Sequence, residues 1–119
     1  MAPTILHEPT ETQESIALAD WLDARGLVWL HVPSEGRRDP GTAAILRRMG
    51  ARAGVPDVLI LSPAAHAPRG CWVELKRRSG GRVSPAQSAW HERLLSLGWA
   101  GGVAHGARDA IALLTRLGY

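Results

Sequence analysis

The 119-residue sequence has no phenylalanine, one cysteine and one lysine. The single Cys71 excludes an internal disulfide and a cysteine-based zinc cluster, which fits a reducing cytoplasm. No apolar run approaches the roughly 20 residues needed to cross a bilayer. Residues 1–9 also lack the basic start and apolar run of a signal peptide. We therefore expect a cytoplasmic protein without a disulfide or a membrane segment.

The rest of the composition is that of one globular domain. Hydrophobic residues make up 45% of the chain, so a core is available. A chain of this length buries roughly two-thirds of the surface that it exposes when unfolded. The net charge of +3 weakly favours a polyanionic partner. We expect a loose tail over residues 1–9 and a single domain over residues 10–119.

Hydrophobic periodicity, capping residues and chain breakers predict an alternation of helices and strands. The predicted helices cover 10–26, 42–49, 84–97 and 108–117, and the predicted strands cover 27–32, 55–61, 71–77 and 99–105. The third helix has Ser84, Pro85 and Gln87 at the positions that favour a capping box. The order α-β-α-β-β-α-β-α predicts an α/β sandwich with a mixed four-stranded sheet flanked by helices.

The one lysine, Lys76, follows Glu74 by two residues in a predicted strand, while the other 13 of the 14 strong cations are arginine. Residues i and i+2 of a strand share a face, so Glu74 and Lys76 project together while Val73 and Leu75 point into the core. A coding sequence rich in Ala, Gly, Pro and Arg would also deplete lysine. The one that remains then indicates a position where a compact ammonium group is needed and a guanidinium does not serve.

Asp57 begins the preceding predicted strand, directly after Pro56. If the two strands are neighbours, Asp57 and Glu74 converge on one hard cation, and the backbone carbonyl of Leu75 and waters complete the octahedron that Mg²⁺ prefers. Such a metal polarises a phosphate and acidifies a water, and Lys76 would orient that water or neutralise charge on the phosphate. Alone, Pro-Asp is typical of a turn and Glu-x-Lys of a solvated strand. Together they favour a metal-dependent nuclease site.

Three segments carry a specific combination of residues. They are 54–60 (Gly-Val-Pro-Asp-Val-Leu-Ile), 72–76 (Trp-Val-Glu-Leu-Lys) and 84–90 (Ser-Pro-Ala-Gln-Ser-Ala-Trp). This combination resembles the VRR-NUC branch of the PD-(D/E)XK nucleases, and the resemblance covers about residues 11–117. It implies a restriction-endonuclease-like core and a Mg²⁺- or Mn²⁺-dependent endonuclease acting on DNA. Stand-alone members are often homodimers that cut branched DNA such as four-way junctions or flaps.

The resemblance also implies roles for single residues. Asp57 and Glu74 would be metal ligands, and Lys76 would be the catalytic lysine. Gln87 would help to hold the nucleophilic water or Lys76, although it is also the capping glutamine of its helix. Glu14 in the first helix would reach the metal through a water, the alternative being an ordinary exposed helix glutamate.

Arginines flank these segments on both sides. Those that we predict to contact DNA phosphates are Arg37, Arg38, Arg48, Arg52, Arg77, Arg78 and Arg82. Binding through such groups weakens as salt concentration rises. For each of them a solvated face of an arginine-rich protein is an equal alternative. One position departs from the family pattern. The family usually has asparagine after a His-x-Pro segment, and in this chain His31-Val32-Pro33 is followed by Ser34.

Two other functions compete with a nuclease. One is a non-catalytic nucleic-acid-binding module that retains the fold, and the other is an interaction or structural domain with an incidental acidic pair. The presence of Asp57, Glu74, Lys76 and Gln87 together argues against the first, because buried charged groups are costly without a function. Metal binding would separate the nuclease from the second.

Overall fold

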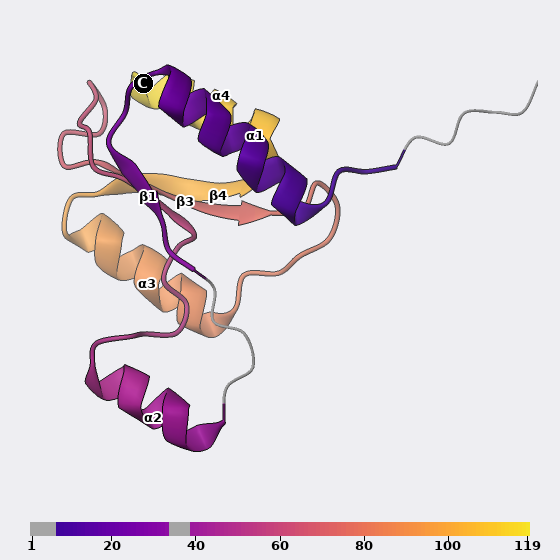
Figure 1. The fold of residues 1–119 in the computed structure, drawn as a ribbon. Coiled ribbons are helices and arrows are strands. Elements are labelled where there is room, and N and C mark those ends of the chain that lie inside the picture. The colour runs from indigo at the N-terminus through magenta and orange to yellow at the C-terminus, as the bar shows by residue number, and fades with distance from the viewer. Residues whose placement is uncertain (1–6, 34–38) are drawn as a thin grey trace, which may run out of the picture.

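The computed structural model describes residues 7–33 and 39–119, and in them the predicted order of helices and strands is confirmed (Figure 1). The helices are α1 (Glu11–Ala24), α2 (Pro40–Arg48), α3 (Pro85–Ser96) and α4 (Ala107–Leu117). The strands are β1 (Trp29–His31), β2 (Val58–Ile60), β3 (Cys71–Lys76) and β4 (Ala100–His105). Strand β2 begins later than predicted, because Pro56 has no amide hydrogen to donate to a neighbouring strand.

The four strands form one mixed sheet in the order β1-β2-β3-β4. The first three are antiparallel neighbours, and β4 lies parallel to β3 after the crossover through α3. Val58 of β2 pairs with Val73 of β3. One step further along the same register, Asp57 lies opposite Glu74, so the topology itself brings the two predicted metal ligands together.

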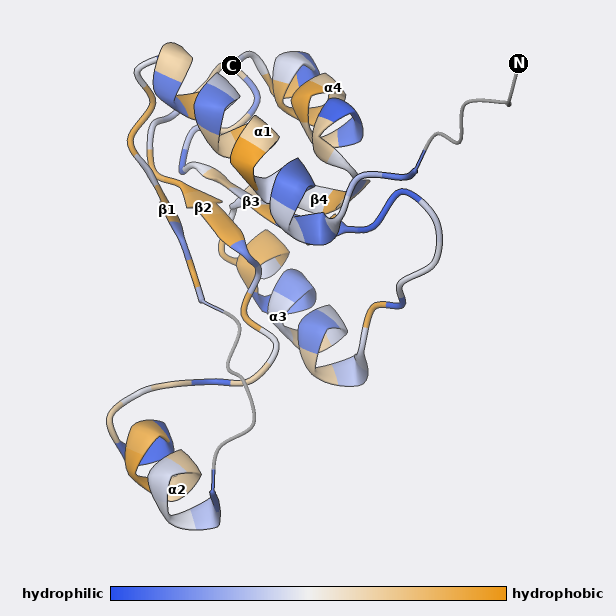
Figure 2. Cartoon of the chain, turned by 45° about the vertical axis from the view of Figure 1, so that its right-hand side comes forward, coloured by the Kyte–Doolittle hydropathy of each residue, from blue (hydrophilic) through white to orange (hydrophobic). Residues whose placement is uncertain are grey.

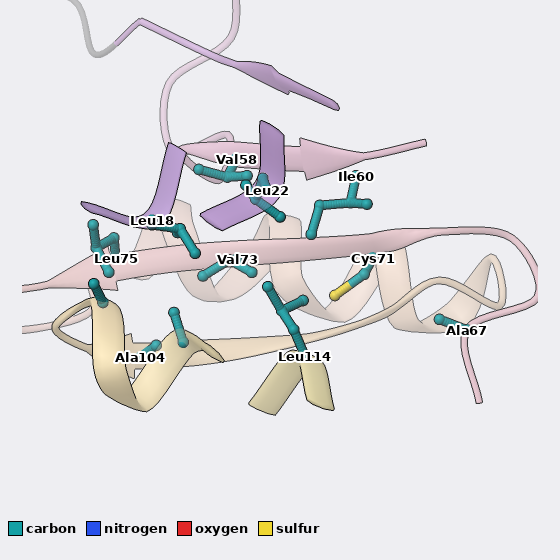
Figure 3. Packing of buried hydrophobic residues seen from close by; sticks show 12 residues of the cluster. Leu18, Leu22, Val58, Ile60, Ala67, Cys71, Val73, Leu75, Ala104 and Leu114 are labelled. Atoms are coloured by element: carbon teal, nitrogen blue, oxygen red, sulfur yellow. The ribbon is translucent and has the colours of Figure 1, made fainter. Parts of the chain in front are cut away.

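Helices α1 and α4 cover one face of the sheet and α3 covers the other (Figure 1). The main core lies under α1 and α4, where Leu18 and Leu22 meet Val73 and Leu114 (Figure 3). Alternation along β3 sends every second side chain into this core, and all residues of β3 except Lys76 are buried. Strand β3 is therefore covered on both sides, and it is the element that carries the Glu-x-Lys pair. None of the helices in the described residues is long and apolar enough to span a membrane.

Helix α2 stands apart from the sandwich and contains no buried residue (Figures 1 and 2). It begins with Asp39, whose Oδ1 accepts the N–H of Thr42 at 2.9 Å, and with proline at the first helical position. The apolar side chains of Ile45 in the helix and of Met49 at its C-cap are 61% and 77% exposed. Local signals thus form this helix without cover from the rest of the domain.

Candidate active site

Two carboxylates meet at the point where β2 and β3 lie side by side. Oδ2 of Asp57 accepts the backbone N–H of Leu75 at 2.8 Å, which fixes the aspartate against β3. Glu74 is only 1% exposed, whereas the sequence pattern placed it on a projecting face. Helix α3 covers that face and accounts for the difference. The result is an acidic pair, made of the buried Glu74 and the partly buried Asp57, next to the single lysine of the chain.

The carboxyl of Glu74 is held in an environment that opposes ionisation. Burial raises the pKa of Glu74 to about 8, hydrogen bonding to Asp57 and the charge of Asp57 add to the shift, and Lys76 opposes it. Glu11, in the first turn of α1, also contributes to raising this pKa. Two adjacent carboxylates ionise together only where positive charge compensates them, so the pair favours a bound cation.

Lys76 is positioned by the first turn of α3. Its Nζ donates to Oε1 of Gln87 at 3.0 Å. The same oxygen accepts the N–H of Ser84 at 2.9 Å, and Oγ of Ser84 accepts the N–H of Gln87, which completes a capping box. Gln87 therefore caps its helix and also accepts from Lys76, so the start of a helix positions the ammonium group, while a part for Gln87 in catalysis stays a prediction.

Gly54, which opens the Gly-Val-Pro-Asp segment, lets the loop before β2 approach the same helix start. Its φ of +85° lies in the left-handed region, and a Cβ built on it would lie 2.5 Å from the carbonyl carbon of Ala86 and 2.7 Å from the nitrogen of Gln87. Any larger residue would separate the loop from α3. The glycine thus holds the segment that carries Asp57 against the segment that carries Gln87.

Glu14 is 3% exposed, so it is not an ordinary exposed helix glutamate. Oε2 accepts the N–H of Ala107 at the start of α4, whose N-cap Gly106 has no side chain to do so. Oε1 of Glu14 accepts a hydrogen bond from Nε of Arg78 at 3.2 Å, and the Arg78 guanidinium forms an ion pair with this carboxylate. A carboxylate at a helix N-terminus is favourable, and here it joins α1 to α4. Its approach to a metal through water stays a prediction, since both oxygens have other partners.

Asp57 lines two cavities. One, of about 490 Å³, is lined by Asp57 together with Glu11, Trp29 and His31, and its walls are mainly apolar. The other, of about 440 Å³, is lined by Asp57 together with Arg52 and Gln87. Sequence reasoning missed Glu11 of α1, which lines the first of these cavities together with Asp57. Its only signal was its position in the first helical turn, three residues before Glu14.

The predicted phosphate contacts fall into four groups. Arg37 and Arg38 lie outside the described residues, as does Ser34. Arg52 reaches the cavity beside Asp57, where its guanidinium donates to the carbonyl oxygen of Arg47 at 2.8 Å. Arg78 is engaged by Glu14. The exposed side chains of the remaining group are Arg48, Arg77 and Arg82.

The donor atoms fit a hard divalent cation. Across residues 7–33 and 39–119, no group of three or more His, Cys, Asp and Glu side chains is arranged to hold a metal. A zinc site would need such a group, whereas Mg²⁺ is usually bound through one or two carboxylates with waters and substrate phosphate. Asp57 and Glu74, joined by the backbone of Leu75, would supply that smaller set of oxygen ligands.

The sheet, the flanking helices and the acidic pair with its lysine define an α/β domain of the PD-(D/E)XK nuclease type. Residues 9–108 match the VRR-NUC domain family, and the chain belongs to this family of nucleases. A solved structure described as a VRR_NUC domain protein is similar with a TM-score of 0.78, at 24% identity over 94% of this chain and 90% of that one. A second, described as a VRR_NUC domain, has a TM-score of 0.60, at 21% identity over 88% of this chain and 94% of that one. These structures confirm the predicted fold. No curated protein matches the chain.

Proposed function

We propose that this nuclease domain is a Mg²⁺- or Mn²⁺-dependent endonuclease that hydrolyses phosphodiester bonds in DNA. The proposal is carried by one arrangement, in which Asp57 lies beside the buried Glu74 while Gln87 holds Lys76 next to them. Membership of a nuclease family supports the reaction class, and PD-(D/E)XK nucleases generally depend on a metal. The remaining parts of the proposal concern how the residues act, which DNA is cut and how the protein assembles.

Asp57, Glu74 and the carbonyl of Leu75 would hold the cation, which when bound polarises the scissile phosphate and acidifies a water. The N–H of Leu75 fixes the Asp57 carboxylate before any ligand arrives, so little reorganisation is needed. Lys76 uses one of its three N–H donors on Gln87, which leaves two for a water or a phosphate oxygen. Attack of water at phosphorus then breaks the bond to the 3′ oxygen and leaves a 5′-phosphate.

Metal binding tests the proposal before any substrate is chosen. Calorimetry with Mn²⁺ should show binding to the unaltered protein and none to Asp57→Ala, because Asp57 is one of the two carboxylates proposed to bind the cation directly. Asp20→Ala, which removes an exposed acid from α1, is the matched control and should bind as the unaltered protein does. Absence of Mn²⁺ binding to all three proteins would contradict the proposal. Binding without cleavage of any DNA would favour the non-catalytic nucleic-acid-binding alternative.

Branched DNA such as four-way junctions or flaps is the substrate that we propose. Incubation of duplex, flap, splayed and four-way junction DNA with Mg²⁺ should give faster cleavage of the branched forms than of the duplex. Activity that survives Glu74→Ala would point to a contaminating nuclease. Equal rates on all four DNAs would show that the enzyme does not select branched structures.

A symmetric junction requires two active sites, so we propose a homodimer. Helix α2 supports this assembly, because Ile45 in the helix and Met49 at its C-cap are exposed and no buried residue anchors the helix to its own domain. Sedimentation velocity should show a dimer that becomes monomeric in Ile45→Glu. Val28→Glu is the control, since Val28 is also 61% exposed but lies beside β1. A monomer at every concentration of the unaltered protein would rule the dimer out.

A further inference from the structure

Helix α3 contacts both members of the Glu-x-Lys pair. Gln87 and His91 are four residues apart and lie on one face of this helix. Gln87 meets Lys76, as described above, and Nε2 of His91 lies 3.3 Å from Oε1 of Glu74. His91 is 8% exposed, which makes it one of the few buried polar residues of the described chain. Two side chains one helical turn apart on α3 thus contact the two side chains of β3 that share one face of the strand.

The imidazole ring of His91 is held in place by an aromatic stack. It lies parallel to the indole of Trp72, with the ring centroids 4.3 Å apart and the planes 16° from each other. The indole is 3% exposed and in turn rests on β4 at Gly101, its partner in the sheet register. A Cβ at Gly101 would overlap the Trp72 ring, so only glycine permits this packing. The imidazole ring of His91 therefore has little freedom to turn away from Glu74.

We propose that His91 is a positioning residue for the metal site, which donates from Nε2 to Oε1 of Glu74 and fixes the orientation of that carboxylate. This inference rests on the proposed metal-dependent function. With a cation bound Glu74 is ionised, and an ionised carboxylate only accepts hydrogen bonds, so in that state the contact requires a proton on Nε2. Removal of a side chain that hydrogen-bonds a metal ligand without binding the metal itself lowers metal affinity by about 10- to 100-fold. His91 acts on the metal through Glu74 and does not bind it.

Two variants separate the hydrogen bond from the stack. His91→Phe keeps a ring on Trp72 but has no N–H, whereas His91→Gln keeps an N–H donor and loses the ring. Calorimetric titration with Mn²⁺ should show affinity about 10- to 100-fold weaker in His91→Phe and within about threefold of the unaltered protein in His91→Gln. A purely structural role for the ring predicts the opposite order. The opposite order, equal losses, or no loss in either variant would overturn the proposal.

A measurement on the unaltered protein decides the matter if a variant does not fold. Nitrogen-15 NMR of the imidazole in the Mg²⁺-loaded protein should show the tautomer with hydrogen on Nε2. The tautomer with hydrogen on Nδ1 alone would overturn the role of His91. Failure of this proposal is distinct from failure of the proposed function. If the unaltered protein binds Mn²⁺ and Asp57→Ala does not, the metal site stands whatever His91 does. If the unaltered protein binds no Mn²⁺, both proposals fall.

Discussion

Replacement of Lys76 by arginine should leave the fold intact and lower the cleavage rate of DNA by about 100- to 1000-fold, the loss typical of one missing charge-stabilising donor at a reacting centre. The substitution keeps a positive charge, so a loss of this size would come from geometry. Nζ of Lys76 is a compact donor held at 3.0 Å by Oε1 of Gln87, in a partly buried position. A guanidinium is longer and planar and cannot occupy that place.

The measurement is the single-turnover cleavage rate on junction DNA. Mg²⁺ is kept saturating, so that weaker binding of the metal does not contribute to the loss. Arg116→Lys is the matched control, because it makes the reverse exchange at an exposed residue of α4 that is not among the predicted phosphate contacts. The control should cut at nearly the original rate, and both variants should unfold near the original temperature. Normal cleavage by Lys76→Arg would mean that the single lysine of the chain is an accident of composition.

Local signals were enough to predict the order of the elements and the mixed sheet. Capping residues, prolines and glycines mark the helix starts and the turns, and these signals depend only on residues close in sequence. The capping box that begins with Ser84 appears in the structure as predicted. Placing Asp57 opposite Glu74 needed one further assumption, that the two strands are neighbours, and the register confirms it.

The depth and the surroundings of the site could not be predicted, because they depend on packing between distant elements. Alternation along β3 placed Glu74 on a projecting face, but α3 covers that face and brings His91 against it. Whether Glu11 or Glu14 points towards Asp57 depends on how α1 is rotated over the sheet. Helix periodicity leaves that rotation open, since positions three apart are neighbours on the helix surface. The structure turns Glu14 to Ala107 and Glu11 to the cavity beside Asp57.

The buried carboxyl of Glu74 should make the protein less stable as pH rises, when a chelator removes divalent metal. Its pKa is 4.5 in the unfolded chain and is raised to about 8 in the folded one. Between these values the folded protein keeps a proton that the unfolded chain has released, so higher pH favours unfolding. The stabilising contribution is complete below pH 4.5 and is lost by about pH 8. Each pH unit in this window lowers the free energy of unfolding by on the order of 1 kcal/mol.

Glu74→Gln removes this dependence, because an amide is neutral at every pH. In EDTA its melting temperature should exceed that of the unaltered protein by a margin that grows towards pH 8, although the variant should not cut DNA. Burial lowers the pKa of His91, which acts in the opposite direction below about pH 6.5, so the difference is clearest above that value. Glu92→Gln, an exposed substitution on α3, should follow the unaltered profile.

Addition of Mg²⁺ completes the experiment, because a cation beside Asp57 and Glu74 compensates their charge. The ion should raise the melting temperature of the unaltered protein most strongly near pH 8 and have little effect on Glu74→Gln. Parallel pH profiles for the two proteins in EDTA would show that Glu74 is not the group responsible. The expected profiles would instead mean that the pair destabilises the folded domain until a metal binds, which is the trade-off typical of a site shaped for function.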